Sequence, residues 1–206
     1  KKIFLVYEDL GFIYEIYING KINNDEREKV FLWDESNRRI NISDNISKGK
    51  NIITILTRTP SWKGHWHANH YVEPIVLIGD FSVKNKTIDK KINKVRAGSW
   101  TEQGFPYFCG TGEYSNRFFI NNEVIQGLGN GKKLFLEISE LGEAAEIYIN
   151  KKRVKRLLWN PFLVDISSFV IGGYNSIRIN VSNTLSNLLT GKRDSGILGN
   201  VNLFLV

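Results

Sequence analysis

The sequence has a single cysteine, Cys109, and no apolar run near the roughly 20 residues that are needed to cross a bilayer. No disulfide can therefore form within the chain, and we expect no membrane-spanning segment. Residues 1–7 become charged too soon to resemble a signal peptide. Long stretches with helical periodicity are also missing. The content of 42% hydrophobic and 24% charged residues, with many turn residues, indicates a globular chain rather than a disordered one.

The chain carries an excess of positive charge, formally +7. Binding to a nucleic-acid backbone needs clustered lysine and arginine side chains. The two clusters here are modest: residues 84–96 have the composition of a basic linker, and residues 151–153 fall where a hairpin turn is expected. We interpret both clusters as solvated segments and expect no nucleic-acid partner.

An internal repeat divides the chain, and a repeat constrains the architecture more than any single motif does. Residues 2–5 and 15–19 return without a gap as residues 133–136 and 146–150, and the Gly-x-Asn turn and strand of residues 49–55 return at 173–179. We therefore predict a first domain at residues 1–83, a basic linker at residues 84–94 and a second domain at residues 95–206.

The second copy has a further strand-like segment, residues 110–120, ahead of the repeated part. The first copy has no counterpart of it. We expect the chain to be a fragment of a longer polypeptide, and the alternative is that the first unit borrows strands from elsewhere.

Short runs rich in β-branched and aromatic residues recur along the chain, separated by turn residues. In residues 53–57 and 177–181 the apolar and polar residues largely alternate, which is the period of a half-buried strand. This spacing favours an antiparallel sandwich over strand–helix–strand units. We predict an all-β fold of two tandem antiparallel β-sandwich modules, the first lacking its N-terminal strands.

Residues 134–179 resemble a known family of sugar-binding domains. They contain a strand that ends in a hairpin at Asn150, an Asn-Pro-Phe-x-x-Asp-Ile stretch at 160–166, and the Gly-x-Asn turn at 173–175. This pattern resembles the galactose-binding-like jelly rolls of glycoside hydrolase family 2, and even more those of bacterial α-L-rhamnosidases and related glycosidases. Residues 110–119 are similar to the opening strand of those modules. One departure is that the hairpin glycine, present as Gly20 in the first copy, is Lys151 in the second.

The resemblance implies a non-catalytic carbohydrate-binding or accessory region of a large bacterial glycoside hydrolase. The expected partners are carbohydrate and the catalytic domain of the parent polypeptide. The alternative is a purely structural module that braces the catalytic domain and has no glycan of its own. Nothing in the chain resembles the catalytic barrel of such enzymes, so we expect no catalytic residues. The compartment stays open, with a secreted or cell-surface location favoured.

Two aromatic segments, residues 59–71 and residues 100–108, contain the candidate binding residues. Residues 59–71 hold all three histidines and two of the five tryptophans between two predicted strands. Aromatic faces can stack on the C–H surface of sugars, and binding residues gather on loops held by a rigid scaffold. The alternative for both segments is packing against the end of the sandwich or against another domain. The candidate carbohydrate-binding residues are Trp62, His65, Trp66, His67, Tyr71, Trp100 and Tyr107.

The sequence predicts no metal site and no cofactor. No carboxylate or cysteine adjoins the three histidines to complete a zinc site. The resemblance leaves a structural calcium open, for which the acidic residues at 25–28 and 34–35 are the only candidates, and we assign no ligand. Trp33 and Trp159 take roughly equivalent places in the two copies, and we expect both to plug the core or an edge.

Overall fold

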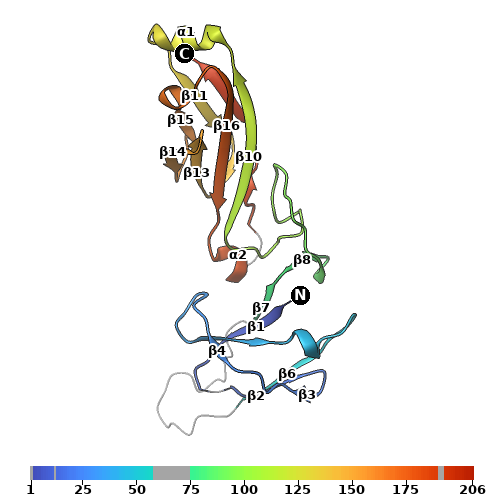
Figure 1. Ribbon diagram of the computed structural model, residues 1–206. Coiled ribbons are helices and arrows are strands. Elements are labelled where there is room, and N and C mark those ends of the chain that lie inside the picture. The colour runs from blue at the N-terminus through green and yellow to red at the C-terminus, as the bar shows by residue number, and fades with distance from the viewer. Residues whose placement is uncertain (1, 12, 58–74, 190–192) are drawn as a thin grey trace. The chain divides into compact units, whose positions relative to one another are not determined.

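The computed structural model describes residues 2–11, 13–57, 75–189 and 193–206, and the chain divides into two compact units between Phe81 and Ser82 (Figure 1). All strand pairs that connect these residues are antiparallel, and the helices are short. The predicted all-β sandwich fold is therefore confirmed. No helix in the described ranges is long and apolar enough to span a membrane. The domain limits that we predicted around a linker stay predictions.

Unit 1 contains two sheets with a shared core. The first has the strand order β4 (Glu28–Lys29), β5 (Asn37–Asn41), β1 (Ile3–Glu8), β7 (Val76–Gly79), and the second has the order β3 (Lys21–Ile22), β2 (Ile13–Ile18), β6 (Ile53–Thr57). A 3₁₀ turn, η1 (Ser43–Asn45), follows β5. The core forms because alternate apolar residues of β1, β2 and β5 point to one side of their strands. It includes Leu5, Ile16, Ile18 and Ile40.

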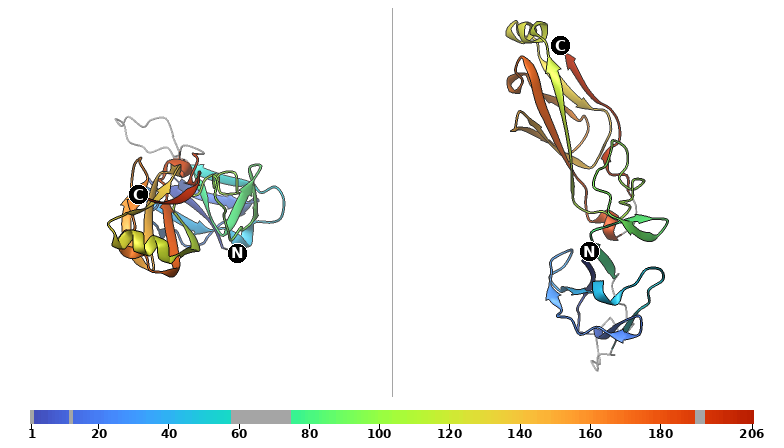
Figure 2. Two further views of the ribbon diagram at one scale, coloured as in Figure 1. Left: turned by 90° about the horizontal axis from the view of Figure 1, so that it is seen from above. Right: turned by 45° about the vertical axis from the view of Figure 1, so that its right-hand side comes forward.

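Unit 2 is the larger sandwich. One sheet has the order β10 (Thr111–Ile120), β16 (Gly173–Ser182), β13 (Ala144–Ile149), β14 (Lys152–Leu157), and the other has the order β15 (Leu163–Asp165), β11 (Leu134–Ile138), β18 (Val201–Leu205). A short pair, β12 (Leu141–Gly142) and β17 (Gly196–Ile197), forms a separate two-stranded sheet. The helices α1 (Asn122–Gly129) and α2 (Ser186–Leu189) lie at opposite ends of this unit (Figure 2).

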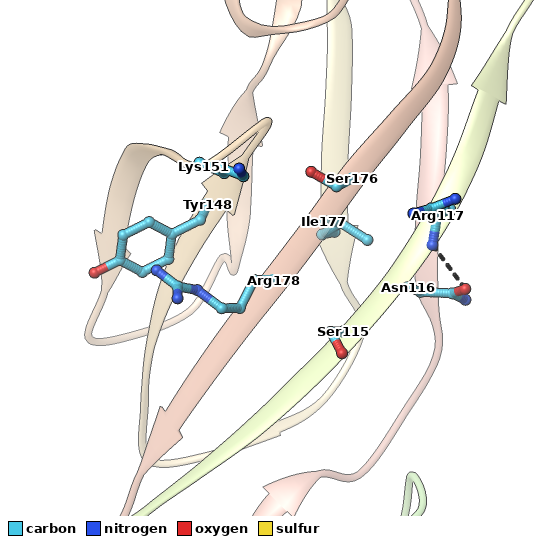
Figure 3. Close-up of a pocket in the computed structure, with 8 residues that line it drawn as sticks. All are labelled: Ser115, Asn116, Arg117, Tyr148, Lys151, Ser176, Ile177 and Arg178. Carbon is cyan, nitrogen blue, oxygen red and sulfur yellow. Dashed lines mark hydrogen bonds between the residues drawn. The ribbon is translucent and has the colours of Figure 1, made fainter.

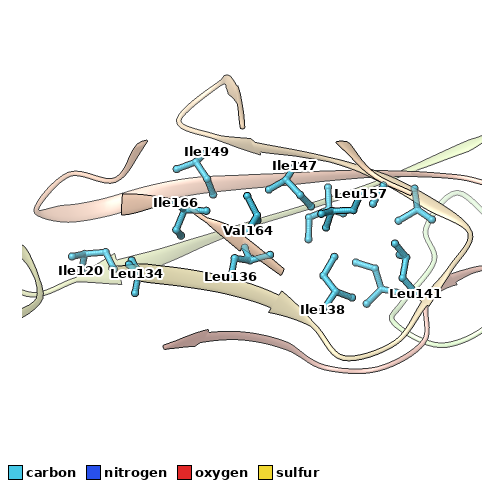
Figure 4. Packing of buried hydrophobic residues seen from close by; sticks show 14 of the residues in the cluster. Ile120, Leu134, Leu136, Ile138, Leu141, Ile147, Ile149, Leu157, Val164 and Ile166 are labelled. Atoms are coloured by element: carbon cyan, nitrogen blue, oxygen red, sulfur yellow. The ribbon is translucent and has the colours of Figure 1, made fainter. Parts of the chain in front are cut away.

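The core of unit 2 lies between its two sheets. In β13 the residues Ala145, Ile147 and Ile149 are buried and alternate with partly exposed ones. Figure 4 shows Ile147 and Ile149 on one side of the core and Leu136 and Val164 among the residues that they face. Because successive side chains of a strand point to opposite faces, the intervening residues of the same strands form the outer face of the sheet.

Two sequence expectations differ from the structure. The segment predicted as a linker contains a strand, β9 (Thr87–Lys90), which pairs with β8 (Phe81–Lys84). All four residues of β9 are exposed, so no apolar alternation marked the strand. The expectation that Trp159 plugs the core or an edge is wrong, because this residue is 74% exposed. Trp33 is half-buried.

Each unit contains its own copy of the same hydrogen-bond network, which is built around a pair of asparagines. In unit 2, Asn150 Nδ2 donates to Asn175 Oδ1 at 2.7 Å, and Asn150 Oδ1 accepts from the N–H of Ser176 at 3.0 Å. In unit 1, Asn19 Nδ2 donates to Asn51 Oδ1 at 2.8 Å, and Asn19 Oδ1 accepts from the N–H of Ile52 at 2.9 Å. Each network connects a hairpin turn to a strand that comes later in the chain, β6 in unit 1 and β16 in unit 2.

A second shared set of bonds holds the other sheet. The Ser167 hydroxyl donates to Asp165 Oδ1 at 2.5 Å and accepts from the N–H of Leu134 at 2.9 Å. In unit 1 the Ser43 hydroxyl donates to Asn41 Oδ1 at 2.6 Å and accepts from the N–H of Ile3 at 2.9 Å. The tandem arrangement of two related modules stays a prediction, and these matched bonds support it.

We expect Asn175→Ala to lower the free energy of unfolding by about 2–3 kcal/mol, because the buried side chain makes four hydrogen bonds that would all be lost. The Asn175 side chain is 1% exposed, accepts from Asn150 and Ile171, and donates to the carbonyls of Ile171 and Gly173. Urea unfolding followed by circular dichroism measures the loss. Asn51→Ala is the matched control, since Asn51 is only half-buried and water can replace its bonds. Equal losses in the two variants would contradict this account.

Asp165→Asn places in unit 2 the residue type that unit 1 has at Asn41. The pKa of Asp165 is held below its usual value by the hydrogen bond from the Ser167 side chain, then by that from the Ser167 N–H, with Lys133 adding to it. A carboxylate with a lowered pKa stabilises the fold above about pH 4 and loses this effect as the pH falls through its folded-state pKa. On acidification below about pH 4, the wild type should therefore lose stability more steeply than the variant. If the wild type and the Asp165→Asn variant lost stability in parallel as the pH falls, the Asp165 carboxylate would not have this stabilising role.

Candidate functional site

The outer face of the β10–β16–β13–β14 sheet carries the candidate site. In the register of β10 and β16, Phe119 lies opposite Tyr174, Arg117 opposite Ser176, and Ser115 opposite Arg178. The alternate residues of β16 face the core: Asn175 and Ile179 are buried, and Ile177 is partly buried and packs against it. The alternation therefore places three successive side-chain pairs on one face, with neighbouring pairs about 7 Å apart along the strands.

An exposed aromatic pair lies at one end of this face. The rings of Phe119 and Tyr174 meet edge to face, with centroids 5.3 Å apart and planes at 74°. The side chains are 61% and 75% exposed. Two large rings that remain this open contribute little to the core, and adjoining exposed apolar side chains often mark a binding surface.

A depression of about 520 Å³ lies over the same strands (Figure 3), and two of its lining residues, Arg117 and Ser176, form the side-chain pair next to Phe119 and Tyr174 in the register of β10 and β16. Its lining includes the cationic side chains of Arg117, Lys151 and Arg178, the ring of Tyr148, and the hydroxyl of Ser176. No carboxylate is among the described residues that line it. Figure 3 shows Lys151 on one side of β16 and Arg117 on the other. We call Phe119, Tyr174, Arg117, Ser176, Arg178 and Lys151 together the outer-face site.

Ion pairs hold part of this surface in place. The Arg178 guanidinium lies over the Tyr148 ring, 4.2 Å from its centroid, and 3.9 Å from Glu113. The Tyr148 hydroxyl donates to Glu146 at 3.0 Å, and Arg156 donates to the same carboxylate at 2.6 Å. The bond from Arg156, followed by that from Tyr148, lowers the pKa of Glu146, so this carboxylate stays ionised. Tyr148 and Arg178 are thereby fixed from the side of β14.

Arg117 and Lys151 differ from these paired cations. Within the described part of the chain, no ion pair or cation–π contact involves either side chain. Both are exposed and border the same depression. The outer-face site therefore combines an apolar platform, hydroxyl groups and two cations that have no acidic partner in the described chain.

Most of the predicted binding residues lie outside the described residues, namely Trp62, His65, Trp66, His67 and Tyr71. Trp100 is 2% exposed, and its indole Nε1 donates to the Tyr114 hydroxyl at 2.6 Å. Tyr107 is 44% exposed. The burial of Trp100 favours the packing role that we gave as the alternative, while sugar contact by any of these residues stays a prediction.

Glycines make room for the Trp100 ring. A Cβ atom added to Gly112 would lie 2.5 Å from the ring, and one added to Gly196 would lie 2.7 Å from its Nε1. Phe108 packs against the ring edge to face at 5.6 Å between centroids. Trp100 is thus enclosed on several sides by segments that are distant in sequence.

The described residues offer no group of three histidine, cysteine, aspartate or glutamate side chains that could hold a metal ion. Two of the predicted acidic candidates already have partners: Glu28 lies 2.7 Å from Arg39, and Asp34 accepts hydrogen bonds from Ser36. A structural calcium stays a prediction without ligands.

Burial and hydrogen bonds shift the pKa of several ionisable groups among the described residues. Burial raises the pKa of Cys109, and the Glu143 carboxylate raises it further, so the reactive thiolate is disfavoured. Among the described residues, three carboxyl groups have a clearly shifted pKa, and in each of them, Asp34, Glu146 and Asp165, hydrogen bonds lower it.

Sequence reasoning missed the outer-face site, although one signal was present. Phe118 and Phe119 are adjacent in a strand, so they must point to opposite faces, and only one of them can enter the core. Phe118 packs against the core and Phe119 is exposed. Finding the partner ring of Tyr174 required the pairing of β10 with β16, which the sequence does not state.

Comparison with known proteins agrees with the predicted resemblance to glycosidase modules. No family model matches the chain. A protein named "Putative beta-glucuronidase" from Formosa agariphila is 31% identical over 125 residues, which cover 58% of this chain. The matched part of this chain covers only 10% of the length of that curated relative.

Two solved structures are also similar. A glycosyl hydrolase family 2 member from Bacteroides cellulosilyticus is 25% identical, with a TM-score of 0.38, over 47% of this chain and 12% of that one. A rhamnosidase from Novosphingobium sp. PP1Y is 16% identical, with a TM-score of 0.47, over 97% of this chain and 24% of that one.

We expect Trp100→Ala to lower the free energy of unfolding by about 3–5 kcal/mol, because the change leaves a cavity and removes the bond to Tyr114. Tyr107→Ala is the control, and we expect it to change stability by less than about 1 kcal/mol, because the ring is partly exposed. Urea unfolding of both variants measures the difference. A Trp100→Ala chain as stable as the wild type would show that the ring is not part of the core.

Proposed function

We propose that this chain is a non-catalytic accessory region of a larger glycoside hydrolase and that it holds carbohydrate on the outer face of unit 2. The observation that carries the proposal is the exposed Phe119–Tyr174 pair beside a depression lined by hydroxyl and cationic groups. Aromatic faces suit the C–H surface of a sugar ring, and the neighbouring polar side chains suit its hydroxyls.

The curated relative supports the parent class. It carries a glycosidase name, and the match covers only 10% of its length. A module of this size inside a long hydrolase can hold the substrate near a catalytic domain without reacting with it.

The outer-face geometry suits an oligosaccharide chain better than a single enclosed sugar. The aromatic pair and the depression follow one another along β10 and β16, so bound sugar units would lie in sequence over the strands. The sheet is rigid because β10 and β16 pair over ten residue positions, Thr111↔Ser182 to Ile120↔Gly173. A preformed surface costs little ordering entropy on binding.

The second candidate function is a brace that contacts the catalytic domain and binds no glycan. It is favoured by a further aromatic pair on the other sheet, Phe135 and Phe204, whose rings stack with centroids 5.8 Å apart. Phe204 is exposed and Phe135 is half-buried, so rings reach solvent on both sheets of the unit, which also suits contact with a neighbouring domain. Glycan binding separates the two functions.

The experiment is a glycan-array screen of the 206-residue chain, followed by calorimetry on the best ligand. We expect the double change Phe119→Ala and Tyr174→Ala to weaken that ligand by about tenfold or more, through lost apolar contact. The unfolding free energy should change by less than about 1 kcal/mol, because a cross-strand pair contributes no more than that.

Phe31→Ala is the matched control, because it removes an aromatic side chain that is 73% exposed and lies in unit 1. Its affinity for the glycan should equal that of the wild type. A blank array, or equal weakening by the control, would exclude the outer-face site and leave the brace as the better account.

A further inference from the structure

We infer that the outer-face site selects acidic glycans, whose sugars carry a carboxylate or a sulfate group. This inference rests on the proposed function and adds the class of ligand. The first observation is that Arg117, Lys151 and Arg178 all line the depression, and that none of the described residues in its lining is a carboxylate.

The charges on this face do not cancel. Glu146 is paired with Arg156 and Arg153, and Glu113 lies 3.9 Å from Arg178. The described residues provide no such partner for Arg117 or Lys151. A negatively charged ligand group would therefore meet two cations that are not paired with a neighbouring carboxylate. Charge-assisted hydrogen bonds between such groups are stronger than hydrogen bonds between neutral groups.

The backbone at Lys151 supports a role for its side chain. Asn150 and Lys151 have φ angles of 49° and 69°, and the matching turn in unit 1 has Asn19 at 52° and Gly20 at 78°. Asn-Gly is the preferred pair for such a two-residue hairpin turn, and lysine is disfavoured at a positive φ. Unit 2 thus has a strained cationic residue where unit 1 has the relaxed glycine. Strain of this kind gathers at functional positions.

The positions of the two unpaired cations fit an extended ligand. Arg117 is on β10 and Lys151 follows β13, and these strands flank β16 (Figure 3). Two strand spacings separate them across the sheet by about 10 Å. A short oligosaccharide that rests on Phe119 and Tyr174 can extend over β16 and present an acidic group to either cation. A nucleic-acid backbone would need a longer cationic track than these residues provide.

The test compares glycans of one backbone by calorimetry with the 206-residue chain. The three probes are cellotetraose, its oxidised form in which each ring carries a C6 carboxylate, and sulfated cellotetraose. We expect both acidic probes to bind at least about tenfold more tightly than the neutral one, as charged hydrogen bonds imply. Tightening by one acidic probe alone identifies which group is recognised. Added salt should weaken the acidic probes most.

Lys151→Gly gives this inference its sharpest variant. It should weaken the acidic probe roughly tenfold, weaken the neutral probe by a clearly smaller factor, and keep or raise the thermal midpoint because the turn strain is relieved. Lys152→Ala is the matched control: it removes the same net charge from the next residue, which does not line the depression. Its affinity should stay within about twofold of the wild type, as expected for an exposed charge outside the binding surface.

Each result separates the two proposals. Equal binding of acidic and neutral probes would overturn the selectivity for acid and leave the proposed function standing. No binding of any probe, together with a blank glycan array, would overturn both. Tight, salt-sensitive binding of single-stranded DNA without binding of acidic oligosaccharides would show that the cations serve a phosphate backbone and would also overturn the inference.

Discussion

The register of β16 against its neighbours is the constraint on which the core and the outer face of unit 2 both depend. Ile179 and Val181 enter the core only if Ser176 and Arg178 point outward, because side chains alternate along a strand. A slip by one residue would bury Arg178 and expose the isoleucine. The paired amides of Asn150 and Asn175 hold the start of β16 against the β13–β14 turn and so oppose such a slip.

The same bonds occur in unit 1, which gives the repeat a physical basis. Asparagine is placed where a turn must accept and donate at once, and serine where a strand N–H would otherwise have no partner. The units diverge at the residues that this scaffold leaves free. Gly20 of unit 1 corresponds to Lys151 of unit 2, which changes the surface chemistry, whereas Asp165 in place of Asn41 keeps the hydrogen bond from the serine and adds a charge.

Residue type alone was a poor guide to the candidate site. The sequence left both sugar contact and packing open for Trp100, and the structure shows that glycines and Phe108 enclose its ring. Trp159 was expected inside and is exposed. Whether an aromatic ring meets solvent depends on which strands and loops pack around it, and these are distant in sequence. The strand β9 escaped notice for a related reason, because a fully exposed strand has no apolar alternation.

The sequence by itself determined the all-β class, the repeat and most of the core strands, because the period of apolar residues and the Gly-x-Asn turns are local properties. It also indicated that Phe118 and Phe119 face opposite ways. Only the tertiary structure decided that Phe119 meets Tyr174 and that Arg117, Lys151 and Arg178 line one depression. Those residues lie on segments joined through strand pairing, and pairing over long sequence separations is set by the packing of the whole sandwich rather than by any local pattern.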